Sequence, residues 1–430
     1  MSESKMLIMF DSKNNNNKFY EASLDDTGNI AVRFGRVGGG VQTTSYSGGK
    51  RKFDSLVASK IKKGYKEAQL EVVSNSSGLI QKVNVVDVAL KQIDCKDDIS
   101  RQLVQTIAKA NIHNITSSTN IKYDEEDGLF KTPLGVVKKS AVEEAMTHLD
   151  SIEGRLENYL KDGTGEDEIS SLNDSYFVLI PNKVATTRDK RHLLFSQKNI
   201  DAQREICKAL LDTLELIESL KERQDKEEKK DVEVEKIFNV SIAYLEDKNK
   251  YDQIVKYYNE SKNSQHGGRI MSSKVKNIYK VAIGNQQEPF AKTEKEIGNV
   301  HELWHGTRVA NLLSIMCKGL MMPKDSPGAK AGAMFGLGTY FASQSSKSIN
   351  YCDHGYWTGG GNGGTVYMFL ASVAVGKAET PRGATGPSGK PSKGYDSFWA
   401  KANISGVRND EIIAFDLGQI RLDYLLEIDL

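Results

Sequence analysis

The sequence has few cysteines and no long apolar run. It contains 4 cysteines in 430 residues, at positions 95, 207, 317 and 352, and none of them forms a Cys-x-x-Cys pair. A disulfide framework or a zinc-finger module is therefore excluded as the organising principle of the fold, and a reducing compartment is favoured. No stretch approaches the roughly 20 consecutive apolar residues that span a bilayer, so no membrane partner is expected.

An excess of charge of one sign is also missing. The 58 Lys and Arg residues face 57 Asp and Glu residues, which leaves a net charge of +1 that says nothing about nucleic-acid binding. Locally, Lys50, Arg51 and Lys52 begin a lysine-rich stretch that ends at Lys66 and contains Asp54 as its one acidic residue. Such a basic face can neutralise phosphates, although charge alone also fits a solvated helix surface.

Hydrophobic patterning divides the chain into three regions. Residues 1–75 carry short apolar or alternating runs between Asn- and Gly-rich turns, followed by a helical stripe, which predicts a small antiparallel sheet plus one helix. Residues 83–228 carry apolar residues at helical spacing and predict an α-helical bundle. Residues 229–430 mix strand-like runs, helices and glycine-rich loops, which predicts a mixed α+β domain. The expected fold class is therefore multidomain α+β.

Three local signals refine this picture. The stripe in the first region consists of Phe53, Leu56, Val57, Ile61 and Tyr65. Residues 74–78, Ser-Asn-Ser-Ser-Gly, are a candidate linker. In the second region, a serine at position 140 and a glutamate at position 143 have the spacing of a capping box, which predicts a helix N-terminus there.

The C-terminal region contains the sequence of a zinc-protease motif, His301-Glu302-Leu303-Trp304-His305. This motif binds zinc when both histidines project from one face of a helix. The third histidine of the extended motif would fall on Asn311, and Gly306 weakens a helix at this point. The alternation of Leu303 and His305 fits a strand and turn better, so we expect no metal site.

Four short motifs follow one another in the same region. They are His305-Gly306-Thr307, Gly338-Thr339-Tyr340-Phe341-Ala342, Ser346-Lys347-Ser348-Ile349-Asn350-Tyr351 and Asn409-Asp410-Glu411-Ile412-Ile413. Taken singly, the tyrosines fit core aromatics, His305 fits a structural histidine and Glu411 fits a surface carboxylate. Their order and spacing together resemble the catalytic domain of poly(ADP-ribose) polymerases.

The resemblance extends over nearly the whole chain. The run from Phe34 to Gly38 is similar to the signature of the WGR domain, with Phe34 at the position of its Trp, and the run Ser175-Tyr176-Phe177-Val178-Leu179-Ile180-Pro181 resembles the helical regulatory domain. The resemblance implies a WGR-like DNA-binding domain at residues 1–75, a helical regulatory domain at 83–228 and an ADP-ribosyltransferase catalytic domain at 229–430.

The resemblance also implies an activity and partners. The chain is expected to be a DNA-break-activated enzyme that transfers ADP-ribose from NAD+ to proteins, elongates the chain and releases nicotinamide, without a metal. DNA ends or nicks and protein acceptors, including the protein itself, are the implied partners. A nuclear location follows for a eukaryotic source, and the cytoplasm or nucleoid for a prokaryotic one.

Specific residues carry these implied roles. The catalytic residues would be His305, Tyr340 and Glu411. The residues that bind NAD+ would be His305, Gly306, Tyr340, Phe341, Ala342, Lys347, Ser348 and Tyr351. The DNA-binding residues would be Phe34, Gly35, Arg36, Lys50, Arg51 and Lys52.

Two alternatives stay open at this point. A complete His-Tyr-Glu triad accompanies chain elongation in the family but is not sufficient for it, so transfer of single units remains an alternative. A DNA-end scaffold with a silent catalytic fold is the other, although the intact triad argues against it. The chain departs from the family pattern at Met321, where many relatives have an arginine, and at Phe34.

Overall fold

The structure is a computed structural model. The residues that it describes are 3–11, 16–37, 39–67, 85–119, 121–124, 129–132, 135–182, 193–227, 238–322, 333–358 and 363–430. The chain divides into two compact units. The first unit comprises Met1–Asn84 and Ile112–Asp225, and the second comprises Val85–Asn111 and Lys226–Leu430. The candidate linker at 74–78, like Gly38 of the WGR-like signature, lies outside the described residues.

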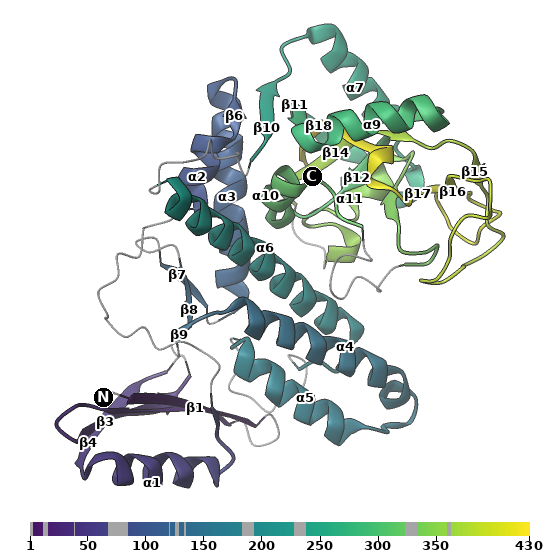
Figure 1. Ribbon diagram of the computed structural model, residues 1–430. Coiled ribbons are helices and arrows are strands. Elements are labelled where there is room, and N and C mark those ends of the chain that lie inside the picture. Colours follow the sequence, from purple (N-terminus) through teal and green to yellow (C-terminus); the bar gives the residue numbers. More distant parts are fainter. Residues whose placement is uncertain are drawn as a thin grey trace. The chain divides into compact units, whose positions relative to one another are not determined.

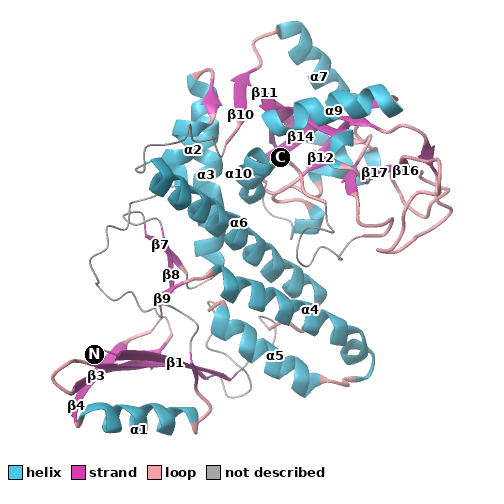
Figure 2. Ribbon diagram, in the orientation of Figure 1, coloured by secondary structure: helices cyan, strands magenta, loops and turns pink. Residues whose placement is uncertain are grey.

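The first unit begins with the antiparallel sheet that the alternating runs predict. Its strands are β1 (Glu3–Asp11), β2 (Asn16–Leu24), β3 (Asn29–Arg36), β4 (Val41–Ser47) and β5 (Lys66–Glu67), in the order β4-β3-β2-β1-β5. Helix α1 (Gly49–Ile61) lies along this sheet (Figure 2). Its Phe53 is buried in the core that the helix forms with the sheet. The predicted stripe is wrong at its end, because Ile61 is 49% exposed and Tyr65 lies beyond the helix.

The helical bundle of the first unit also matches the expectation from helical spacing. It contains α4 (Lys139–Asp162), α5 (Glu166–Leu179) and the long helix α6 (Gln197–Glu227), with a small sheet of β7 (Lys122–Asp124), β8 (Leu129–Thr132) and β9 (Gly135–Val136). The predicted capping box is wrong. Helix α4 begins earlier, with Lys138 as its cap and no side-chain cap hydrogen bond, so Ser140 already lies within the first turn.

The second unit is built on a six-stranded sheet. Its order is β12-β14-β18-β11-β10-β6, and all neighbours are antiparallel except the pair of β10 and β6. The strands are β6 (Asp94–Cys95), β10 (Val240–Tyr244), β11 (Lys274–Ile283), β12 (Val300–Gly306), β14 (Thr365–Ala374) and β18 (Ile420–Asp429). Strand β6 lies between α2 (Val85–Gln92) and α3 (Asp98–Ser118), so part of the predicted helical region adds to this sheet.

A second, smaller sheet lies next to the first. It has the order β13-β17-β16-β15, formed by β13 (Thr339–Phe341), β17 (Glu411–Ala414), β16 (Ser397–Ala400) and β15 (Ala378–Glu379). The two sheets meet where Trp304 of β12 pairs with Ala342, which directly follows β13. Figure 1 shows β12 and β17 in the same part of the molecule, with α11 (Ser345–Ile349) beside them.

The core of the second unit surrounds this junction. Trp304 is fully buried, stacks on Tyr257 with ring centroids 5.1 Å apart, and donates its indole N–H to Ser261. Both partners come from the segment formed by α7 (Lys248–Glu260) and the residue that follows it. The strand that enters the junction is therefore fixed by a large buried aromatic side chain. No helix among the described residues is long and apolar enough to cross a membrane.

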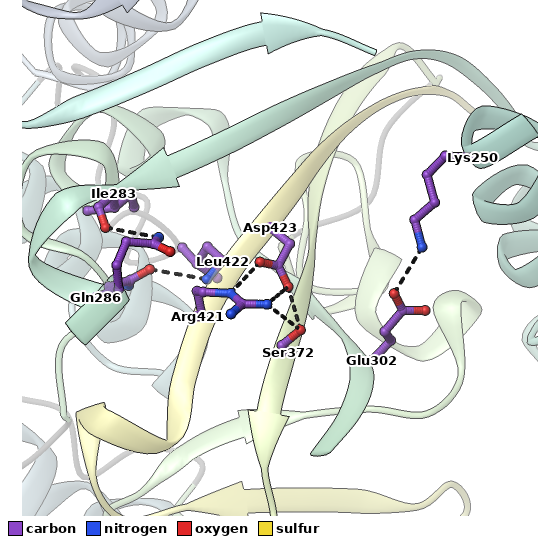
Figure 3. Close-up of polar contacts among 9 residues, drawn as sticks. Lys250, Ile283, Gln286, Glu302, Ser372, Arg421, Leu422 and Asp423 are labelled. Carbon is purple, nitrogen blue, oxygen red and sulfur yellow. Dashed lines mark hydrogen bonds and ion pairs between the residues drawn. The ribbon is translucent and has the colours of Figure 1, made fainter. Parts of the chain in front are cut away.

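A bulge in the central strand β18 is stabilised by side chains from neighbouring elements (Figure 3). The pairing of β14 with β18 shifts so that Asp423 has no opposite residue. Asp423 accepts hydrogen bonds from Ser372 and from Arg421. The buried N–H of Leu422 donates to the side-chain oxygen of Gln286, on α9 (Gly284–Ile297), at 3.1 Å. The glutamine thus supplies an acceptor for a buried backbone N–H next to the bulge.

Replacing this glutamine should destabilise the second unit. In Gln286→Ala the buried N–H of Leu422 loses its acceptor, which costs about 1–3 kcal/mol of unfolding free energy. Urea unfolding followed by tryptophan fluorescence measures the loss. The matched control is Gln287→Ala, whose exposed side chain bonds the carbonyl of Ile283 on its own helix end, and which should change stability by less than about 0.5 kcal/mol. Equal effects of the two substitutions would contradict the assigned role.

Candidate active site

The site begins at the C-terminal end of β12. The backbones of Trp304 and Ala342 exchange two hydrogen bonds of 2.9 and 3.0 Å, which places the next residue, His305, beside β13. There, Nδ1 of His305 lies 2.9 Å from the carbonyl oxygen of Tyr340, and its ring lies 5.5 Å from the ring of Phe341. A nitrogen at this distance from a carbonyl must carry the proton, so Nε2 of a neutral imidazole is left as an acceptor.

Gly306 is required by the close approach of α11. A Cβ atom built on Gly306 would lie 1.8 Å from the carbonyl oxygen of Ser348 and 3.2 Å from the sulfur of Cys352. The hydroxyl of Ser348 donates to the carbonyl of Trp304 at 3.0 Å, which pins the helix to the strand. The backbone of Gly306 and the hydroxyl oxygen of Ser348 are therefore neighbours, as the sequence motifs predict.

Two tyrosines lie near the same carboxylate. The hydroxyl of Tyr340 donates to the carbonyl of Gly336 and accepts from the N–H of Phe335, so its ring is held in place. Burial raises the pKa of Tyr340 to about 12, and the charge of Glu411 acts in the same direction. Tyr351 is 45% exposed, and burial of its hydroxyl, with Glu411 again nearby, raises its pKa to about 12. Both phenols therefore stay neutral at physiological pH.

Glu411 forms an ion pair with Lys347. Glu411 opens β17, which pairs with β13, whereas Lys347 comes from α11, and their side chains are 16% and 13% exposed. Burial lowers the pKa of Lys347, even though the carboxylate of Glu411 favours its charged form. Each group therefore holds the other at a site that is largely shielded from water.

The remaining two residues of the expected NAD+ site contribute in a different way. The side chains of Phe341 and Ala342 are each 2% exposed. Phe341 pairs with Ile412 of β17, and Ala342 pairs with Trp304. Their backbones therefore join β12 to β17, while their side chains are part of the core. The structure brings together all eight residues that the resemblance assigns to NAD+.

The zinc-protease motif forms strand β12 and not a helix. On a strand, His301 and His305 are separated by about 13 Å, too far to share a metal ion. His301 contacts the side chain of Asn299 and the edge of the Trp399 ring, away from the contacts of His305. Among the residues that the structure describes, no group of three or more His, Cys, Asp or Glu side chains could hold a metal ion.

The sequence motifs do not predict the polar network that surrounds Glu411. Asp410 accepts from the indole of Trp399 at 2.8 Å and from the N–H of Ala402 at 2.9 Å. Asn409 bonds to Asn263 and to His266, which lie 146 and 143 residues away in sequence. Asn263 and His266 belong to a polar loop without a motif, so only the fold reveals them.

In the first unit, the WGR-like signature lies on β3. Phe34 is half-buried opposite Tyr20, with the two ring centroids 6.5 Å apart, so it packs against the core of the sheet. Gly35 allows the loop to approach, because a Cβ there would lie 2.4 Å from the carbonyl oxygen of Gly40. Arg36 ends the strand.

Arg36 is the basic residue at one end of β3, and a separate basic group lies at the opposite end. This group consists of Lys50, Arg51 and Lys52, all exposed in the first turn of α1. That turn is attached to the turn between β2 and β3 by the N–H of Gly49, which donates to Gly28. Lys50 pairs with Glu3 and with Asp54, so part of the basic charge is neutralised. The two groups are separated by the length of β3, about 20 Å, and do not form one patch.

Comparison with protein families matches three models in sequence order. The WGR domain matches residues 3–72, the "Poly(ADP-ribose) polymerase, regulatory domain" matches 99–238, and the "Poly(ADP-ribose) polymerase catalytic domain" matches 248–430. The catalytic match contains every residue of the site described above, from Asn263 to Glu411.

Individual relatives agree with these matches. Poly [ADP-ribose] polymerase 1 of Gallus gallus is 27% identical over 74% of this chain and 33% of its own length. Protein mono-ADP-ribosyltransferase PARP3 of Mus musculus is 27% identical over 97% of this chain and 86% of its own length. Poly [ADP-ribose] polymerase 2-B of Oryza sativa subsp. japonica is 25% identical over 96% and 70%. The chain thus spans a third of the first relative and most of the other two.

Three domain models in the expected order, together with relatives that match nearly the whole chain, identify this chain as a member of the poly(ADP-ribose) polymerase family that carries the family's NAD+-dependent ADP-ribosyltransferase domain.

Proposed function

We propose that this chain transfers ADP-ribose from NAD+ to protein acceptors, including itself, elongates the chain, and does so when it binds a DNA break. The observation that supports the chemistry best is the convergence of His305, Tyr340 and Glu411 from three strands onto one place beside α11. Such a set positions and polarises a substrate without a metal.

The nicotinamide end of NAD+ would be held by planar and polar groups. The aromatic leaving group stacks between the rings of Tyr340 and Tyr351. The oxygen of its carboxamide accepts from the backbone N–H of Gly306, and the carboxamide NH2 donates to the hydroxyl oxygen of Ser348. The Ser348 proton already donates to Trp304, which leaves that oxygen as an acceptor.

The ribose hydroxyls would be held by His305 and Glu411. Nε2 of His305 accepts from a hydroxyl of the adenosine ribose, which positions the substrate. Glu411 accepts from a hydroxyl of the nicotinamide ribose and stabilises the oxocarbenium-like sugar that forms as the bond to nicotinamide breaks. The bonding electrons leave with nicotinamide. The acceptor then bonds to the sugar carbon, and its proton passes to Glu411. Lys347 holds pyrophosphate or an acceptor carboxylate.

Elongation is favoured over single-unit transfer by the carboxylate at position 411, which can orient a hydroxyl of an attached ADP-ribose as the next acceptor. Single-unit transfer is the second candidate, because a relative named as a mono-ADP-ribosyltransferase matches 97% of the chain. Gel analysis of products made with labelled NAD+ separates them, since elongation gives a ladder and single transfer gives one shifted band.

DNA activation is supported by the WGR match at residues 3–72 and the regulatory match at 99–238. In this proposal the helical regulatory domain restricts the NAD+ site until DNA binds, and a DNA break shifts the equilibrium because it binds the active state more tightly. We place the protein in the nucleus if its source is eukaryotic, and in the cytoplasm or nucleoid if it is prokaryotic.

Removing the carboxylate at position 411 should abolish transfer. Glu411→Gln keeps the size of the side chain but loses the charge that stabilises the transition state, so kcat should fall by about 100-fold or more while KM for NAD+ changes little. Release of labelled nicotinamide in the presence of nicked DNA measures both constants. The matched control is Glu302→Gln, because the exposed Glu302 pairs only with Lys250, and it should retain wild-type activity. Full activity of Glu411→Gln would refute the mechanism, and loss of activity in the control would revive the zinc hypothesis.

Adding one methyl group at Gly306 should damage the site. In Gly306→Ala the new Cβ would overlap the carbonyl of Ser348, so α11 must move and carry Lys347 and Ser348 with it. We expect kcat/KM for NAD+ to fall by about 100-fold, since a displacement of about 1 Å can cost this much. Gly383→Ala is the control, because no atom of the residues that the structure describes lies within 4 Å of its Cβ position. Similar kinetics of the two variants would contradict the packing argument.

Nicked DNA should raise the rate of transfer about 5- to 150-fold, as expected for a typical coupling energy of about 1–3 kcal/mol. Because the two basic groups lie at opposite ends of β3, the variant Arg36→Gln and the triple variant Lys50→Gln, Arg51→Gln, Lys52→Gln report on them separately. Whichever of the two variants removes contacts to DNA phosphates should bind DNA more weakly, and its affinity for DNA should depend less on the salt concentration. A wild type whose rate does not respond to DNA ends or nicks would refute DNA activation but not the transfer chemistry.

A further inference from the structure

A polar turn joins the two segments that supply Lys347 and Glu411. It comprises Asn263 and η2 (Ser264–His266), between α7 and α8 (Gly268–Ser272). On one side, the N–H of Asn263 donates to the hydroxyl oxygen of Ser346 at 2.7 Å, and Nδ1 of His266 lies 2.8 Å from the same oxygen. Ser346 directly precedes Lys347.

On the other side, the turn contacts the segment before Glu411. Nδ2 of Asn263 donates to the amide oxygen of Asn409 at 2.7 Å, and Nε2 of His266 lies 3.0 Å from the amide nitrogen of Asn409. Ser346 is fully buried and Asn409 is 8% exposed. Since these polar groups are shielded from water, each of these hydrogen bonds is costly to break.

The network fixes the protonation state of His266. The amide oxygen of Asn263 accepts from the N–H of Gln265, so its NH2 faces Asn409. The amide oxygen of Asn409 is therefore the acceptor, and its NH2 points at Nε2 of His266. Nε2 must carry a lone pair, which leaves the proton on Nδ1, where it is donated to Ser346. Only a neutral imidazole satisfies every bond.

We propose that Asn263 and neutral His266 are positioning residues for ADP-ribosyl transfer, because they hold Ser346 and Asn409 together and thereby fix Lys347 opposite Glu411. The inference rests on the proposed role of Glu411. In this role neither residue has to touch the substrate, because both act through the geometry of the ion pair. The hydrogen bonds of Asn263 and His266 to Ser346 and Asn409 are called the brace below. A proton on Nε2 would face the NH2 of Asn409 and break the brace.

The surroundings of His266 favour the neutral form. Burial lowers the pKa of His266, and the positive charge of Lys347 acts in the same direction. The charged side chains on the segments around it are Lys262, Arg269, Lys347, Arg408, Asp410 and Glu411. Because the folded pKa lies below the ordinary value of about 6.5, the brace is intact at neutral pH. It is lost as the pH falls through that folded pKa, so kcat should decline on the acid side.

The test measures kcat and KM for NAD+ with the full chain and nicked DNA over roughly pH 5 to 9, where a histidine titrates. In His266→Ala, kcat at neutral pH should fall by about tenfold or more while KM changes less than about threefold, because substrate contacts remain. His266→Gln should recover most of that loss, since its amide can accept from Asn409 and does not titrate, and its acid-side decline should be absent.

A matched histidine and a double variant sharpen the test. His148, in α4 of the first unit, is also a half-buried histidine whose pKa is lowered by burial, and His148→Gln should keep the wild-type pH profile. If His266 acts through Lys347 and Glu411, then in a Lys347→Ala background His266→Ala should cost less than about threefold, because the groups work as a unit.

The outcomes separate this inference from the proposed function. A wild type that releases no nicotinamide with nicked DNA overturns the function itself. An active wild type with unchanged kcat in His266→Ala, or with the acid-side decline retained in His266→Gln, overturns only the positioning role. Thermal unfolding checks that the variants fold, and if His266→Ala does not fold, the pH profile of His266→Gln decides the question.

Discussion

The arrangement of the site depends on the pairing of Trp304 with Ala342. Trp304 is anchored on one side by its buried indole, which stacks on Tyr257 and bonds to Ser261. Its backbone carbonyl accepts a hydrogen bond from the hydroxyl of Ser348, and its backbone exchanges two hydrogen bonds with that of Ala342. One residue of β12 thus joins the large sheet, the small sheet and α11. Because buried backbone groups must be paired, the junction has a fixed geometry. That geometry determines the positions of the side chains on either side of the junction.

A second constraint is the arrangement of charge around this junction. Lys347 and Glu411 lie side by side and are largely buried. The attraction between the two charges offsets part of the desolvation free energy of each. Buried pairs of this kind depend on geometry, so hydrogen-bonded neighbours matter. Asp410 is held by Trp399, and Asn409 by the turn that contains His266. Several buried polar groups thus orient the carboxylate of Glu411, as the proposed chemistry requires.

Sequence patterns predicted much of the fold and part of the site. Alternating runs predicted the small antiparallel sheet within residues 1–75, and helical spacing predicted the helices within residues 83–228, because local periodicity reports which face is buried. They failed where burial is decided by distant partners. Ile61 continues the stripe of α1 yet is exposed, and β18, the strand between β14 and β11, was not predicted. A capping box at position 140 fits the sequence, but α4 begins before it.

The sequence by itself determined the family and the order of its three domains, and it singled out His305, Tyr340 and Glu411 as candidate catalytic residues, since motif order and spacing are properties of the chain. The sequence also contains a zinc-protease motif from His301 to His305. This motif lies on a strand, where the two histidines are too far apart to share a metal ion. Only the tertiary structure decided that Lys347 pairs with Glu411, that Gly306 must lack a side chain, and that Asn263 and His266 join the site. These are contacts between residues far apart in sequence, and no local pattern encodes them.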